Sequence, residues 1–152
     1  MALTQEQRKT IEWLILRPVE FGRLMGFTKL TDLHNGWIQQ MLKGDEDETL
    51  QGHRGSYKTT CLSVALALIM ILYPNDKTLF MRKTTQDIAE IVAQVKKILL
   101  SPYTAYIVKK LYGCELKITV DRFDQLSTNL AVNDARGTPQ LVAQGIGGSM
   151  TG

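Results

Sequence analysis

The sequence predicts an α/β fold, and three observations lead to this prediction. Segments with helical periodicity alternate along the chain with short strand-like segments. The 152 residues, 44% hydrophobic and 22% charged, are enough for one domain with a hydrophobic core. The longest apolar run, residues 61–73, is shorter than the roughly 20 residues that a membrane span needs. The charged N-terminus is not a signal peptide either, so we expect no membrane association.

Three helices are predicted at the N-terminus. Thr4 and Gln7 have the spacing of a capping box, which predicts a helix over residues 5–16. Pro18 can begin a second, short helix that the following glycines limit. Thr31 is a candidate cap for a third helix, whose apolar residues have helical spacing. We therefore expect an N-terminal helical segment over residues 1–45.

The acidic run "GDEDE" follows this segment. A run of like charges is usually a solvated loop, and a metal site is the alternative. From residue 46 onward we predict a second unit, residues 46–152. Its first helix, over 59–73, is apolar nearly all round and should be buried, and "PND" at 74–76 ends it.

The remaining elements alternate in type. "KTLFMRK" predicts a strand, and Thr84 is a candidate cap for the helix that follows. "ELKITVD" and "LVAQG" predict two further strands. The helix after Thr84 should bury a stripe made of Ile88, Ile91, Val92, Val95, Ile98 and Leu99.

The stretch "QGHRGSYKTT", residues 51–60, is close to the phosphate-binding pattern G-x-x-x-x-G-K-[ST]. Gly52, Lys58 and Thr59 are in register, whereas Tyr57 occupies the position of the second glycine. A short apolar lead precedes the loop and a helix follows, so backbone N–H groups and the helix dipole would point at phosphates. Lys58 would contact the β- and γ-phosphates, and the Thr59 hydroxyl would bind Mg²⁺. The alternative is a glycine-rich turn capped by a helix, without a ligand.

Tyr57 decides between these two interpretations. If its position requires a positive φ, a residue other than glycine costs about 1–2 kcal/mol. If the position requires only a free face, the ring can point outward at little cost. Gly55 and Ser56 keep the loop slim, and His53 is expected to be a loop histidine without a catalytic role.

Four segments together resemble the ATPase domain of the large terminase subunit, the DNA-packaging motor of tailed bacteriophages. They are "WIQQML", "LQGHRGSYKTT", "LFMRKTTQDI" and "GIGGSMTG", in matching order over roughly residues 27–152. The resemblance implies a P-loop NTPase fold of the ASCE type, with a parallel sheet flanked by helices. It also makes Tyr57 an allowed departure from the glycine pattern, because this family often departs from it.

The resemblance assigns roles residue by residue. Lys58 and Arg54 match catalytic residues, since the loop arginine is proposed to touch the γ-phosphate. Trp37 and Gln39 match an aromatic–Gln pair that contacts adenine, although Gln39 lies one residue further along than usual. Core packing of Trp37 is the alternative, and a salt-bridged surface position is the alternative for Arg54. The residues implied to bind ATP and Mg²⁺ are Trp37, Gln39, Gly52, His53, Arg54, Gly55, Ser56, Tyr57, Lys58, Thr59 and Thr60, with Thr59 on the metal.

The family continues past its "TG" with an aliphatic strand ending in Asp-Asp or Asp-Glu, which orients Mg²⁺ and activates water. These residues stop at Gly152, so we expect a partial ATPase domain that does not turn over ATP alone. Asp121 is a poor substitute, because its strand alternates and Arg122 follows it. A parallel sheet without this strand would have open edges, which another chain could cover.

The implied partners are double-stranded DNA, the portal and the small terminase subunit, in the cytoplasm of the bacterial host. The formal charge of +3 permits a nucleic-acid partner without indicating one. Cys61 lies in an apolar run and should be a buried thiol, as suits a reducing cytosol. The alternatives are another P-loop DNA-dependent ATPase, such as a helicase-like motor, or a non-catalytic fragment recognised by a partner protein.

Overall fold

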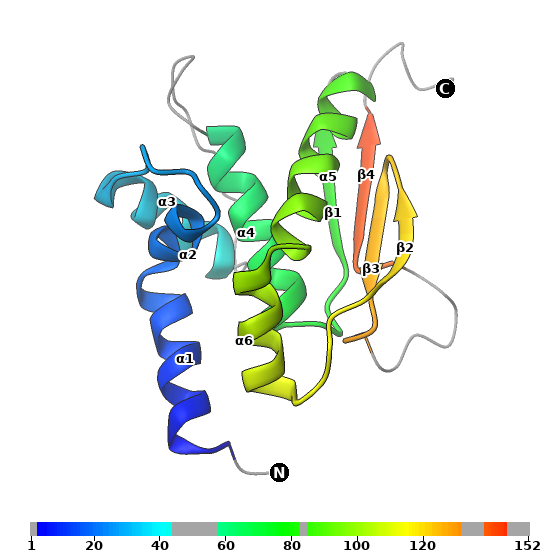
Figure 1. Cartoon of the computed structure of the whole chain (residues 1–152). Helices are drawn as coiled ribbons and strands as arrows, with labels where there is room; N and C mark the ends of the chain where they lie inside the picture. Colours follow the sequence, from blue (N-terminus) through cyan, green and yellow to red (C-terminus); the bar gives the residue numbers. More distant parts are fainter. Residues whose placement is uncertain (1–2, 44–57, 83–84, 132–138, 146–152) are drawn as a thin grey trace.

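The computed structural model describes residues 3–43, 58–82, 85–131 and 139–145. This part of the chain is α/β, with six helices and a four-stranded mixed sheet. Figure 1 shows their arrangement. In chain order the elements are α1 (Gln5–Leu16), α2 (Pro18–Leu24), α3 (Asp32–Lys43), α4 (Lys58–Leu72), β1 (Thr78–Arg82), α5 (Thr85–Leu99), α6 (Pro102–Tyr112), β2 (Ile118–Arg122), β3 (Gln125–Thr128) and β4 (Leu141–Gly145).

The sheet has the strand order β1-β4-β3-β2. β1 and β4 are parallel, with Thr78 opposite Leu141 and Arg82 opposite Gly145. β3 is antiparallel to both β4 and β2. The expected parallel sheet is therefore wrong for this part of the chain, which has a mixed sheet. The physical reason is the two-residue connection between β2 and β3, which is long enough only for an antiparallel pair.

Several helix boundaries follow the sequence signals closely. The predicted capping box is present, because the Gln7 backbone N–H donates to Thr4 Oγ1 over 3.1 Å and the Thr4 N–H donates to Gln7 Oε1 over 2.9 Å. α2 begins at Pro18, as expected. All six residues of the predicted stripe on α5 are buried. α6 and β3 were not predicted.

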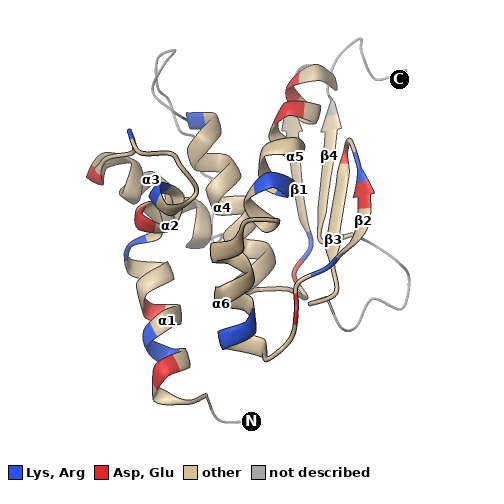
Figure 2. Ribbon diagram, viewed as in Figure 1, with Lys and Arg blue, Asp and Glu red and all other residues tan. Residues whose placement is uncertain are grey.

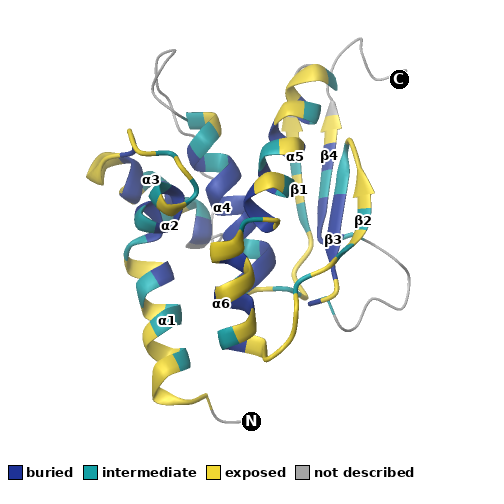
Figure 3. Cartoon of the chain, viewed as in Figure 1, coloured by how far each residue is buried: buried dark blue, intermediate teal, exposed yellow. Residues whose placement is uncertain are grey.

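The hydrophobic core lies between the helices and one face of the sheet. α4 is buried along most of its length, and α5 packs against β1, β3 and β4. Figure 3 shows the buried positions gathered along α4 and the middle of the sheet. On β1, Phe80 packs against the core, whereas its neighbours Leu79 and Met81 are exposed. The described helices therefore cover one face of β1, and the expected covering of both faces is not seen there.

Charged side chains of both signs are interspersed over α1, α5, α6 and β2 (Figure 2). This distribution agrees with the small formal charge and shows no dense basic stripe on the described elements. None of the helices in the described ranges combines the length and the apolar character required to cross a bilayer. Cys61 is buried, as predicted, and Cys114 is exposed; both are free thiols. The acidic run at 44–48 lies outside the described residues.

Candidate nucleotide-binding site

The N-terminus of α4 is the part of the predicted phosphate-binding motif that the structure describes. α4 begins at Lys58, and α5 begins directly after the end of β1. In Figure 1 both helices begin at the end of the molecule where β1 and β4 finish. In open α/β sheets, ligands bind at the carboxyl ends of the strands and often at helix N-termini. The fold thus gives Lys58 and Thr59 the location that a phosphate site requires.

The first turn of α4 has a composition that favours anions. Lys58 and Thr60 are half-buried, Thr59 is exposed, and no acidic residue lies in this turn. The N-terminal end of a helix carries about half a positive elementary charge, so the Lys58 ammonium adds to a field of the same sign. Thr59 is accessible to a ligand, as a metal-binding hydroxyl must be.

A polar contact between helices stiffens the same end of α4. The Ser63 hydroxyl lies 3.0 Å from the Thr59 carbonyl oxygen and 2.6 Å from Oε1 of Gln94 on α5. The hydroxyl has one proton, so it donates to one of these oxygens at a time. Sequence reasoning did not identify Ser63 or Gln94, because the contact joins residues 31 positions apart.

The remaining loop positions lie outside the described residues. These are Gly52, His53, Arg54, Gly55, Ser56 and Tyr57, whose assignments stay predictions. Arg82 lies at the carboxyl end of β1, in register with Gly145. Asp121 is on β2, at the far edge of the sheet from β1, and its carboxylate pairs with Lys96 Nζ at 2.7 Å. This ion pair gives Asp121 a structural partner and agrees with the expectation that it does not activate water.

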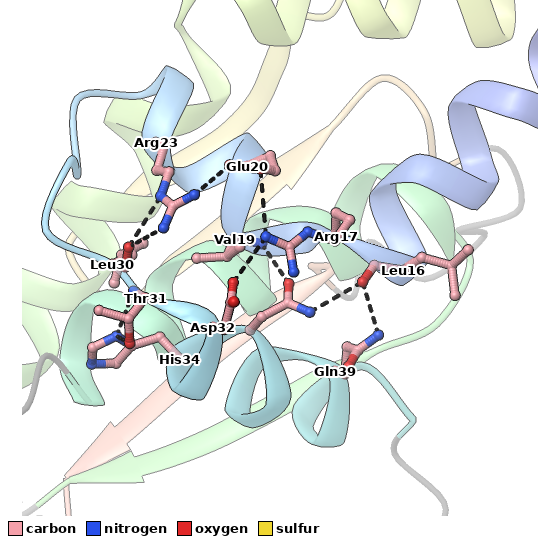
Figure 4. Close-up of polar contacts among 11 residues, drawn as sticks. Leu16, Arg17, Val19, Glu20, Arg23, Leu30, Thr31, Asp32, His34 and Gln39 are labelled. Carbon is pink, nitrogen blue, oxygen red and sulfur yellow. Dashed lines mark hydrogen bonds and ion pairs between the residues drawn. The ribbon is translucent and has the colours of Figure 1, made fainter.

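Gln39 is engaged by the backbone of α1. Its Nε2 donates to the carbonyl oxygens of Ile15 and Leu16, over 3.1 and 3.0 Å. Figure 4 shows the Gln39 side chain reaching toward Leu16. These two carbonyls belong to the last turn of α1 and have no partner within the helix. Gln39 therefore caps α1 in this structure, and an adenine contact would require its amide to be shared or released.

Trp37 is half-buried and packs against the hydrophobic core. Its ring meets that of His34 edge-on, with the ring centroids 5.2 Å apart. His34 in turn accepts a hydrogen bond at Nδ1 from the Thr31 backbone N–H over 2.9 Å, which caps the first turn of α3. Core packing, the alternative role for Trp37, is thus what the described residues show. Adenine stacking stays a prediction.

Ion pairs and an amide hold the junction of α1, α2 and α3 in place (Figure 4). Arg17 pairs with Asp32 at 3.0 Å, and Arg23 pairs with Glu20 at 2.8 Å. The hydrogen bond from Arg23, followed by that from Arg17, holds the pKa of Glu20 below its ordinary value. Asn35 accepts from the Val19 N–H over 3.0 Å and is buried. The N-terminal segment is therefore joined firmly to α3.

Within the described ranges, no group of three or more His, Cys, Asp or Glu side chains could hold a metal ion. Comparisons with protein-family models, with curated proteins and with solved structures found no match.

Proposed function

We propose that this chain is the nucleotide-binding part of the ATPase domain of a phage large terminase subunit. In the whole protein, located in the cytoplasm of the bacterial host, ATP hydrolysis would drive double-stranded DNA into an empty capsid. The observation that carries the proposal is the position of Lys58 and Thr59. They begin a buried helix at the end of the molecule where the parallel strands β1 and β4 finish.

The proposed chemistry follows from the residue types. The Lys58 ammonium neutralises charge on the β- and γ-phosphates, and the Thr59 hydroxyl binds the Mg²⁺ that bridges them. Arg54, from the loop before α4, would offset charge that develops on the γ-phosphate during transfer. A placed water and a carboxylate to activate it complete hydrolysis in this family. By the resemblance, they come from a strand that follows the "TG" at residues 151–152.

The α1–α2–α3 segment supports the proposal indirectly. In the family resemblance, the adenine-contacting pair lies upstream of the phosphate loop, and here Trp37 and Gln39 are on α3, which packs against α4. An element that contacts both α1 and α4 can link nucleotide binding to the N-terminal helices.

The experiment is a titration of the chain with a fluorescent ATP analogue, with and without Mg²⁺. We expect binding that Mg²⁺ strengthens. The titration is repeated with blunt-ended duplex DNA and with single-stranded DNA of the same length. A change in nucleotide affinity caused by duplex ends supports a packaging motor. A response to single-stranded DNA alone would contradict it and favour a helicase-like ATPase.

A further inference from the structure

A groove of about 830 Å³ lies between α1 and α6, away from the N-terminus of α4. We call it the α1–α6 groove. One face of each helix lines it, together with the last residue of α2. The lining residues are Gln5, Glu6, Lys9, Thr10, Trp13, Leu24, Tyr103, Tyr106, Ile107 and Lys110.

The two helices are joined by polar contacts at one end of the groove. Gln7 Nε2 donates to the carbonyl oxygens of Lys110 and Leu111, over 3.2 and 3.3 Å. Glu6 pairs with Lys110 Nζ at 3.0 Å. These contacts lie at the start of α1 and the end of α6, so the helices are antiparallel (Figure 1). The rest of the two facing surfaces is available to a ligand.

The walls of the groove are aromatic and aliphatic. Ile107 is buried and Trp13 is half-buried, whereas Tyr103 and Tyr106 are 51% and 68% exposed and Leu24 is 42% exposed. A cluster of this kind is unusual on a free surface, and tyrosine and tryptophan are the side chains that most often dominate binding energy at interfaces.

The rim of the groove favours an acidic partner. Glu6 is the one acid among the lining residues, and Lys110 neutralises it. Lys110 Nζ also lies 5.7 Å from the centroid of the Tyr106 ring. Lys9 forms no ion pair with any other residue in the described part of the chain. Lys109, on the adjoining surface, is exposed as well.

We propose that the α1–α6 groove binds an amphipathic helix of a partner protein. Apolar side chains of that helix contact Trp13 and Tyr106, and its acidic side chains face Lys9. Two antiparallel helices that present residues at i, i+3 and i+4 form the complement of such a helix. The Glu6 carboxylate on the rim would repel phosphates, which favours a protein over a nucleic acid. This site goes beyond the proposed nucleotide-binding function and does not depend on it.

The test uses the full chain and two labelled synthetic peptides of about 18 residues, or five helical turns. Both have a Leu/Phe stripe at helical spacing. One carries Glu beside the stripe and the other carries Lys at the same positions. We expect fluorescence anisotropy to show that the Glu peptide binds at least about fivefold more tightly, because rim charges contribute modestly to affinity.

Two pairs of variants locate the binding. Tyr106→Ser should weaken binding of the Glu peptide about tenfold, as loss of an interface anchor does, whereas Phe123→Ser, at an exposed position on the β2–β3 turn, should not. Lys9→Glu should weaken the Glu peptide and strengthen the Lys peptide. Lys29→Glu is the charge-matched control. Circular dichroism of each variant checks that the fold is retained, and ATP binding should be unchanged in all four.

Equal binding of the two peptides, absence of binding, or no exchange of preference in Lys9→Glu would overturn the proposal. An oligonucleotide that binds the chain and is lost in Tyr106→Ser would assign the groove to nucleic acid instead. A dimer in sedimentation that Tyr106→Ser dissociates would assign it to a second copy of the chain.

Discussion

The Ser63 hydroxyl of α4 lies 2.6 Å from Oε1 of Gln94 on α5, one turn after the residue proposed to hold Mg²⁺. The same hydroxyl is 3.0 Å from the carbonyl oxygen of Thr59. Ser63 is fully buried and Gln94 is half-buried, so this hydrogen bond is protected from competing water. It fixes the helix that begins at Lys58 against the helix that packs on the sheet.

Gln94→Ala should lower the free energy of unfolding by about 1 kcal/mol, the usual net value of one hydrogen bond. The effect is limited because Ser63 can still donate to the Thr59 carbonyl oxygen. Urea denaturation measures it. Gln86→Ala, at an exposed position on the same helix, is the control. Equal midpoints for the two variants would show that the Ser63–Gln94 contact does not stabilise the fold.

Gln140 should be among the most sensitive polar positions of the chain. Its side chain is buried, and Oε1 accepts from the Thr128 N–H over 2.7 Å and from the Thr128 hydroxyl over 2.6 Å. Its Nε2 donates to the carbonyl oxygens of Met70 and Pro74, both over 3.0 Å. One amide thus joins β3 to the C-terminal end of α4.

Gln140→Leu keeps the size of the side chain but removes all four hydrogen bonds. Each unpaired buried group costs about 1–3 kcal/mol, so we expect a loss of about 3 kcal/mol or more in the free energy of unfolding. Gln144→Leu, on an exposed position of β4, makes the same chemical change as a control. A loss for Gln140→Leu no larger than for Gln144→Leu, in urea melts with equal m-values, would refute this role.

The two cysteines should differ in reactivity. Burial raises the pKa of the Cys61 thiol to about 11, and Cys114 is exposed. In the native chain at pH 8, a maleimide should therefore label Cys114 and leave Cys61 unmodified, and in denaturant it should label both. Mass spectrometry counts the adducts. Two adducts on the native chain at the same rate would contradict the buried position of Cys61.

The same shift in the pKa predicts a dependence of stability on pH. The folded state holds the thiol proton more tightly than the unfolded state, whose thiol ionises near pH 9. The contribution of the neutral Cys61 thiol is complete below pH 9 and decreases as the pH rises toward 11. Cys61→Ala should flatten this part of the curve, and Cys114→Ala should leave it unchanged.

Sequence patterns identified the elements that have strong local signals. The stripe from Ile88 to Leu99 has an unambiguous helical period, and the Thr4–Gln7 spacing specifies the start of α1. α6 was missed because its β-branched and aromatic residues resemble a strand. Its ends nonetheless carry helix signals, since Ser101 caps it and Gly113 adopts a φ of 72° after its last residue.

Tertiary contacts explain the rest of the differences. β3 has only four residues and no glycine in its turn, so its local signal is weak, and the antiparallel pairing that it imposes could not be inferred. The family resemblance placed Gln39 beside adenine, whereas its amide lies on carbonyls of α1, more than 20 residues away in sequence. Long-range contacts of this kind leave no periodic pattern in the sequence.

The most direct test of the central proposal is a calorimetric titration of ATP with Mg²⁺ into the chain and into Lys58→Ala. A charge-assisted contact to phosphate contributes roughly 1.5–3 kcal/mol, so we predict that the variant binds about tenfold or more weakly. Lys97→Ala, which removes an exposed lysine of α5, should bind as the unmodified chain does. Equal ATP affinity of the unmodified chain and Lys58→Ala, or no binding by either, would contradict a phosphate site at the start of α4.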